Sequence, residues 1–215
     1  MTPIDRSKYM DEAETRRLRT VIEAWSITDR HAGRVRGPLV WAVVDTALLT
    51  GLRVSEMARL TVGDVDLKRG ALNAWRHKRR DKRQETLAIP PELTQHLKEF
   101  IEWKESVDQP VDASSALFVG KRGPLTTEGL MQLWKVAIKR AGLPKELSIH
   151  CARHTIAVHL LKKTGNLRQV QKQLGHANPA TTANMYADIA FEDMQAGVAG
   201  LYEAGEGERR RSGQR

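Results

Sequence analysis

Five side chains spread along the chain carry the functional groups that chemistry at a phosphodiester requires. Two arginines, Arg53 and Arg153, have guanidinium groups, which grip phosphate oxygens through paired hydrogen bonds. Two histidines, His150 and His176, can transfer protons near neutral pH. A late tyrosine, Tyr186, has a hydroxyl that can attack phosphorus as a covalent nucleophile. This combination indicates chemistry on a nucleic-acid backbone.

The local sequence places these side chains where they can face a ligand. His150 and Arg153 are three residues apart on a predicted helix and therefore share one face. Arg53 follows Gly51 at a predicted helix start, where its side chain and backbone N–H groups can both address an anion. His176 comes directly after a predicted helix end. Each motif alone more often marks a solvated helix face, a surface arginine or a helix cap, so the prediction depends on their joint occurrence.

A zinc site is the competing interpretation of the same region. His150 and His154 are four residues apart, as in the two-histidine zinc motif of metalloproteases. That motif needs a glutamate next to the first histidine, and Cys151 stands there instead. No third carboxylate ligand is evident, so a metal is not expected. Cys151 is expected to be a small buried residue, and His154 to support the site or pack against its helix.

The composition is that of a globular protein with a basic surface. The chain has 215 residues, enough for one large domain or two small ones, with 40% apolar and 28% charged residues. Lys and Arg outnumber Asp and Glu by 35 to 26, a net charge of +9. This excess favours a polyanionic partner without selecting among DNA, RNA and an anionic membrane.

Other sequence features indicate a cytoplasmic location and no membrane insertion. Cys151 is the single cysteine, which excludes an intrachain disulfide and a zinc knuckle. The N-terminus has no apolar signal core. The most apolar stretch, residues 39–52, is interrupted by Asp45 and is shorter than the roughly 20 residues that a bilayer span needs.

Hydrophobic periodicity predicts a mainly α-helical chain with a small antiparallel β-sheet, an α+β fold. Helices are expected at residues 10–25, 39–49, 54–60, 91–103, 127–141, 149–164 and 167–174, in a short segment from 179, and around 191–201. A polar stretch over 26–37 is expected to end the first helix, and residues 117–119 to form a short strand. Residues 205–215 contain no apolar residue and are expected to be disordered.

Two short predicted strands, residues 72–76 and 85–89, enclose a strongly basic hairpin tip. Its members, apart from Lys78, are Arg76, Arg79, Arg80, Lys82 and Arg83. We expect these side chains to bind DNA phosphates, because closely spaced cations displace the counterions of the DNA backbone. A solvated run of charge is the alternative.

In combination, these motifs resemble the catalytic domain of the tyrosine recombinases, the phage-integrase family. The similarity runs from about residue 10 to about residue 203. It rests on four motifs in a fixed order, which are Thr50-Gly51-Leu52-Arg53-Val54-Ser55-Glu56, His150-Cys151-Ala152-Arg153-His154, Leu174-Gly175-His176 and Tyr186.

The resemblance implies a role for each residue. Arg53 and Arg153 would clamp the scissile phosphate. His150 would assist proton removal from the nucleophile, Tyr186, and His176 would hydrogen-bond a non-bridging oxygen.

The family also uses a hairpin lysine as the general acid for the leaving 5′-oxygen. Aligned from the first strand, Lys78 takes this position; aligned backward from Pro90, Lys82 does. Lys78 is preferred, and Lys82 remains the alternative.

The implied reaction is site-specific cleavage and rejoining of double-stranded DNA through a 3′-phosphotyrosyl intermediate. Guanidinium and imidazole groups would stabilise the transition-state charge, so neither a metal nor ATP is required and no cofactor is expected. The resemblance also implies a tetramer of protomers on synapsed DNA, with a monomer as the alternative state without DNA.

Two departures from the family pattern qualify this interpretation. The step from His176 to Tyr186 is ten residues, one more than the family usually has. The sequence is interpreted as a catalytic domain over residues 1–204 with a basic tail over 205–215, and without the N-terminal core-binding domain of most members. It would then be a fragment or a naturally short member. A DNA-binding module with this fold but without strand-exchange turnover is the alternative function.

Overall fold

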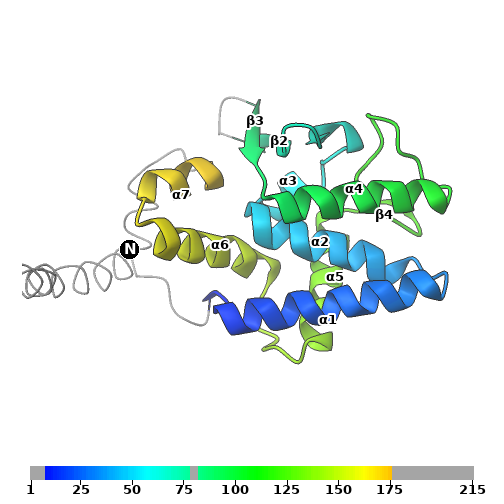
Figure 1. Cartoon of the computed structure of the whole chain (residues 1–215), viewed down its shortest axis with the longest axis horizontal. Coiled ribbons are helices and arrows are strands. Elements are labelled where there is room, and N and C mark those ends of the chain that lie inside the picture. Colours follow the sequence, from blue (N-terminus) through cyan, green and yellow to red (C-terminus); the bar gives the residue numbers. More distant parts are fainter. Residues whose placement is uncertain (1–7, 78–81, 176–215) are drawn as a thin grey trace, which may run out of the picture.

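The computed structural model describes residues 8–77 and 82–175, and helices form most of this described part (Figure 1). The helices are α1 (Glu12–His31), α2 (Arg36–Thr50), α3 (Val54–Met57), α4 (Pro91–Ser106), α5 (Thr127–Arg140), α6 (Ile149–Thr164) and α7 (Leu167–Leu174). The strands are β1 (Val65–Asp66), β2 (Ala71–His77), β3 (Lys82–Ala88), β4 (Val119–Gly120) and β5 (Gly123–Pro124). The predicted class, mainly α with a small antiparallel sheet, is confirmed. The helices and the tail predicted beyond residue 175 lie outside the described residues.

The apolar helix α2 is the centre of the fold. Nearly all of its residues are buried, as expected for a helix that is hydrophobic on every side. Helices α1, α4, α5 and α6 all pack against it (Figure 1). It begins at Arg36, earlier than predicted, because Pro38 is accommodated within its first turn.

Helix α1 continues through residues that were predicted to be a polar break. It ends at His31 rather than near residue 25, and Ser26 and Asp29 are buried along it. Asp29 accepts hydrogen bonds from the Arg34 Nε at 2.7 Å and from the Gly37 backbone N–H at 2.8 Å. These hydrogen bonds satisfy the buried carboxylate of Asp29. The polar residues of this stretch therefore join α1 to α2 instead of ending α1.

A polar network crosses the core at the residue that interrupts the apolar stretch. Asp45 of α2 is fully buried and accepts a hydrogen bond from the Nε of Arg19 at 2.7 Å. Its other oxygen lies 2.8 Å from Nδ1 of His96 on α4. The His96 ring stacks on Trp41 with centroids 4.7 Å apart. Asp45 therefore links α1, α2 and α4 through one carboxylate.

Strands β1, β2 and β3 form an antiparallel sheet in which the β2–β3 hairpin is the main element. The ladder runs from the Ala71–Ala88 pair to the His77–Lys82 pair, so the hairpin strands are longer than predicted. Leu72, Ala74 and Arg76 are buried, whereas Trp75 between them is 46% exposed. Side chains of a strand alternate between the two faces of a sheet, so Arg76 belongs to the face that packs on the core. The strand predicted at 117–119 is instead β4, which pairs with β5 in a separate two-stranded sheet.

The end of α2 requires a glycine. Gly51 has φ +66° and caps the helix in the left-handed conformation. A Cβ at this position would lie 2.8 Å from Cγ2 of Ile156 and 2.9 Å from Cδ2 of Leu174. The close approach of α6 and α7 to the end of α2 therefore depends on the missing side chain.

We expect Gly51→Ala to destabilise the fold more than Gly33→Ala does. Both glycines have φ +66°, but a Cβ at Gly33 would meet nothing within 4 Å. The backbone term of about 1–2 kcal/mol is shared, and overpacking adds about 1–3 kcal/mol at Gly51 only. Urea unfolding of the two variants measures the difference. Equal losses of unfolding free energy would contradict a packing requirement at Gly51.

Candidate active site

Arg153 joins the ends of two helices. Its guanidinium is buried, with the residue 9% exposed. One terminal nitrogen, Nη1, donates to the Gly51 carbonyl at 2.6 Å, and the other, Nη2, donates to the Leu174 carbonyl at 2.6 Å. These carbonyls belong to the C-terminal ends of α2 and α7, where helices leave backbone acceptors unpaired and carry partial negative charge. Arg153 satisfies both ends at once.

The junction between α2 and α7 has a second contact. The side-chain Nε2 of Gln173 donates to the Thr50 carbonyl at 3.3 Å. Gly175 then ends α7 with φ +63°, in the same left-handed conformation as Gly51. The residue that follows is His176, so this junction sets the point from which the chain continues toward the predicted His176 and Tyr186.

Arg53 begins α3 and is held by a buried carboxylate. Its backbone N–H donates to Oε2 of Glu56 at 2.8 Å, and its Nη1 donates to Oε1 at 2.8 Å. The Glu56 side chain is 1% exposed, whereas the Arg53 side chain is 42% exposed. Glu56 therefore fixes one edge of the guanidinium and leaves much of the side chain accessible to a ligand. Because Arg53 lies two residues after Gly51, both predicted arginines belong to the same junction.

His150 lies on α6 one turn before Arg153 and is exposed. His150 and Arg153 therefore lie on the same helix, three residues apart, as predicted. His154, on the next turn, is partly buried, and burial together with the positive charge of Arg153 lowers its pKa. Cys151 is buried as expected, and burial raises the pKa of its thiol.

The hairpin places one of its predicted DNA-contacting residues in an unexpected environment. Arg76 is 2% exposed and donates from Nη2 to the Gln173 carbonyl at 2.6 Å. Its Nε lies 3.4 Å from Oε2 of Glu85 on β3. Burial lowers the pKa of Arg76, and the nearby carboxylates of Glu56 and Glu85 oppose that effect. In this structure Arg76 contacts α7 rather than the surface, which corrects the expectation of an exposed phosphate ligand.

The other predicted residues are not all described. Lys78, Arg79, Arg80, His176 and Tyr186 lie outside the described residues. Lys82 and Arg83 lie in β3, but their side chains are not described. The choice between Lys78 and Lys82 as general acid therefore stays a prediction.

Glu56 holds Arg53 through the second half of a capping box, a role that was not predicted although the sequence carries a signal for it. A glutamate three residues after a helix N-cap is the second half of a capping box, and Glu56 follows Arg53 by three residues. For Arg76 the signal was its even spacing from Leu72 and Ala74 along β2.

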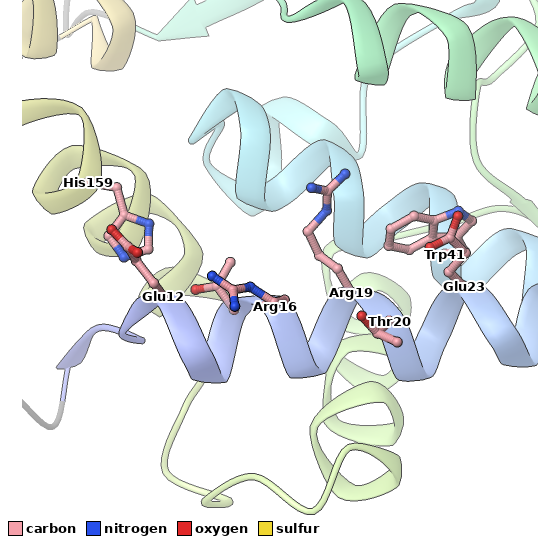
Figure 2. A pocket seen from close by; sticks show the side chains of 8 residues that line it. Glu12, Arg16, Arg19, Thr20, Glu23, Trp41 and His159 are labelled. Carbon is pink, nitrogen blue, oxygen red and sulfur yellow. The ribbon is translucent and has the colours of Figure 1, made fainter. Parts of the chain in front are cut away.

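An open pocket of about 360 Å³ lies away from these residues, along α1. Its lining includes Glu12, Arg16, Trp41 and His159, and Figure 2 shows Arg19 pointing from α1 toward α2. None of the predicted site residues lines it. Within residues 8–77 and 82–175, no three His, Cys, Asp or Glu side chains are grouped to hold a metal ion. No helix in this same part of the chain is long and apolar enough to span a membrane.

The fold and the two arginines define a mainly helical domain in which Arg53 and Arg153 meet where α2, α3, α6 and α7 come together. A family model described as the phage integrase family matches residues 8–193, and the chain belongs to this family.

Curated relatives carry the name tyrosine recombinase. The chain is 35% identical over 163 residues to tyrosine recombinase XerC of Halalkalibacterium halodurans, which covers 72% of this chain and 51% of that protein. It is 34% identical over 142 residues to tyrosine recombinase XerC of Herpetosiphon aurantiacus, with 66% and 45% covered. The chain thus spans about half the length of these relatives.

Solved structures share the fold. The crystal structure of XerA recombinase matches with a TM-score of 0.73 and 26% identity, covering 94% of this chain and 67% of that one. XerH site-specific recombinase bound to palindromic difH substrate matches with a TM-score of 0.70 and 20% identity, covering 91% and 53%. The mainly helical fold predicted from the sequence is therefore the fold of these recombinases.

The lowered pKa of His154 predicts a loss of stability in acid. Because the unfolded chain binds a proton at this residue more readily, the free energy of unfolding should fall as the pH drops below the ordinary histidine pKa of 6.5. His154→Gln should reduce this slope. Urea unfolding between about pH 8 and about pH 5 measures it. His159 also has a pKa lowered by burial, so the double variant with His159→Gln should be flatter still. An unchanged slope in His154→Gln would show that His154 does not cause the loss.

Proposed function

We propose that this chain cleaves and rejoins DNA at specific sites through a covalent bond between Tyr186 and a 3′-phosphate. The observation that carries the proposal is the junction of α2, α3, α6 and α7, where Arg53 and Arg153 are held by separate partners. Family membership supports the same activity. The names of its relatives, tyrosine and site-specific recombinases, agree with it.

The contacts of the two arginines suit a phosphate that gains negative charge. Glu56 orients Arg53 through its Nη1, and two helix-end carbonyls orient Arg153 through Nη1 and Nη2. Groups held in place before the substrate arrives stabilise a transition state without the cost of reorganisation. A phosphate between these arginines would therefore meet a preorganised positive site.

The proposed reaction has two balanced steps. The Tyr186 oxygen attacks phosphorus and forms a phosphotyrosyl bond while the bond to the 5′-oxygen breaks. His150 assists removal of the tyrosine proton, His176 hydrogen-bonds a non-bridging oxygen, and Lys78 gives a proton to the leaving oxygen, with Lys82 as the alternative acid. In the second step a 5′-hydroxyl attacks the phosphorus and forms the new phosphodiester bond while the bond to the Tyr186 oxygen breaks. The proton lost by the attacking hydroxyl is balanced by the proton that the tyrosine oxygen regains, so both the DNA backbone and Tyr186 are restored. The phosphotyrosyl bond conserves the energy of the broken bond, so the step needs no ATP.

The proposed partner is double-stranded DNA. The net charge of +9 and the basic hairpin tip favour a polyanion. Solved structures of XerH recombinase and of the Tn1549 transposon integrase, which share this fold, are complexes with DNA. We propose that residues 1–204 act as the catalytic domain, and that four protomers assemble on two synapsed sites, with a monomer as the alternative without DNA.

A suicide-substrate experiment tests the nucleophile. A target site is first selected from random duplexes by binding to the chain, and a nicked DNA that carries this site is then prepared. On this DNA the chain should form a covalent adduct that survives denaturing electrophoresis. Tyr186→Phe should abolish the adduct because it removes the attacking oxygen. Tyr202→Phe is the matched control and should leave adduct formation intact. If the unaltered chain binds this DNA but forms no adduct, the alternative of a DNA-binding module without turnover is correct.

The hairpin tip gives a second prediction. Replacing Arg79, Arg80 and Arg83 together with Ala should weaken binding to all duplex sequences. It should also lower the slope of log K against log salt by roughly 0.9 for each lost phosphate contact. Fluorescence anisotropy over a salt series measures the slope.

A control variant that removes the same number of positive charges elsewhere shows whether the effect depends on the position of the hairpin tip or only on net charge. Arg16, Arg17 and Lys139 are exposed on α1 and α5, away from the hairpin in Figure 1. Replacing these three with Ala should change the salt slope less than the tip variant does. An unchanged slope in the tip variant would refute phosphate binding by these arginines.

A further inference from the structure

We propose that Arg76 is a positioning residue that fixes the end of α7 against the β2–β3 hairpin, and thereby sets where the chain continues toward His176 and Tyr186. The proposal rests on the DNA-cleaving function above. It gives Arg76 a task that differs from phosphate binding and that links two proposed parts of the catalytic set, the hairpin lysine and the nucleophile.

Arg76 points from β2 into the core. It alternates with the exposed Trp75 along β2 and shares the inward face with Leu72 and Ala74. The register of the hairpin pairs it with Arg83, and its Nε lies 3.4 Å from Glu85. The strand therefore directs Arg76 away from the side on which Trp75 is exposed, toward α7.

Arg76 contacts the end of α7. Nη2 of Arg76 donates to the Gln173 carbonyl at 2.6 Å, next to the Leu174 carbonyl that Arg153 binds. Two arginines from different elements thus cap consecutive carbonyls of one helix end. A side chain at Gly175 would overlap Nη1 of Arg76, so the guanidinium occupies the space that a Cβ would fill. The last residue before His176 is packed directly against Arg76.

The burial of the Arg76 guanidinium has a desolvation cost. A buried cation is expensive unless charges and hydrogen bonds offset its desolvation. Among the described residues, Nε and Nη1 of Arg76 have no hydrogen-bond partner, and the compensation comes from Glu85 and from Glu56. A buried apolar side chain would avoid this cost. The charged group is therefore best explained by the bond it makes to α7.

Glu56 connects this contact to the arginine clamp. Its carboxylate binds Arg53 directly, and its charge also acts on Arg76. Lys78, the proposed general acid, follows Arg76 by two residues in the sequence. Arg76 consequently ties the hairpin, the junction of the arginines and the end of α7 to one another, and small displacements there would separate reacting groups.

Arg76→Met and Arg76→Lys test the proposal on the full chain. Methionine keeps a long side chain but cannot donate to Gln173. It should slow adduct formation on the suicide substrate on the order of 10²-fold, while the affinity for the same DNA stays unchanged. Lysine keeps a charged donor and should recover most of the rate. A wild-type rate of adduct formation in Arg76→Met would overturn the proposal. A loss of DNA affinity in parallel with the loss of rate would also overturn it, because Arg76 would then contact DNA. The proposal would also be overturned if Arg76→Lys formed the adduct as slowly as Arg76→Met does.

A pair of glycine variants decides the matter if Arg76→Met does not fold. Gly175→Ala pushes on Arg76 from the other side, whereas Gly165, with φ +60° and no atom within 4 Å of its added Cβ, has the same backbone conformation without that contact. Gly175→Ala should slow adduct formation far more than Gly165→Ala. Equal rates in the two variants would overturn the proposal. Failure of the wild-type chain to form an adduct would instead refute the proposed function.

Discussion

The guanidinium of Arg153 between the carbonyl ends of α2 and α7 is the interaction on which the site depends. Two helix C-termini carry the same partial charge and would repel each other if they met without a cation. Arg153 supplies that cation and satisfies one acceptor at each end. Gly51 makes the meeting sterically feasible, because its missing side chain leaves room for Leu174 and Ile156. Fold and proposed chemistry thus use one residue, because the contacts that join the helices also orient the guanidinium that we propose to bind the scissile phosphate.

Three arginines gather near this junction, and each is held by a different kind of partner. Arg53 has the carboxylate of Glu56, Arg153 has backbone carbonyls, and Arg76 has Glu85 together with a carbonyl of α7. Like charges at short range would destabilise the folded chain unless each were compensated. Compensation by fixed groups also sets their orientation, and preorganised donors are what a developing phosphorane charge requires. The orientation of each of the three guanidinium groups is therefore fixed by contacts within the protein itself.

Local signals in the sequence were sufficient for most helices and for the arginines that begin or line them. His150 and Arg153 share α6 as predicted, because their spacing along one helix decides this feature. The features that local patterns missed depend on distant contacts. The polar stretch over 26–37 was predicted as a break because composition suggested exposure, whereas Asp29 is buried by bonds to Arg34 and Gly37. The two-residue strands β4 and β5 are too short to carry a periodic pattern.

The hairpin shows why charge alone was a poor guide to exposure. A run of basic residues was interpreted as one surface, although a strand sends alternate side chains to opposite faces. Trp75 and Arg76 accordingly face in opposite directions, and a register slip of one residue would exchange them. The slip is prevented by the ladder from Ala71–Ala88 to His77–Lys82 and by the burial of Leu72 and Leu87. The core thereby fixes Arg76 against the end of α7, where its Nη2 donates to the Gln173 carbonyl. One strand register therefore decides both which residues of β2 enter the core and which of them meets the end of α7.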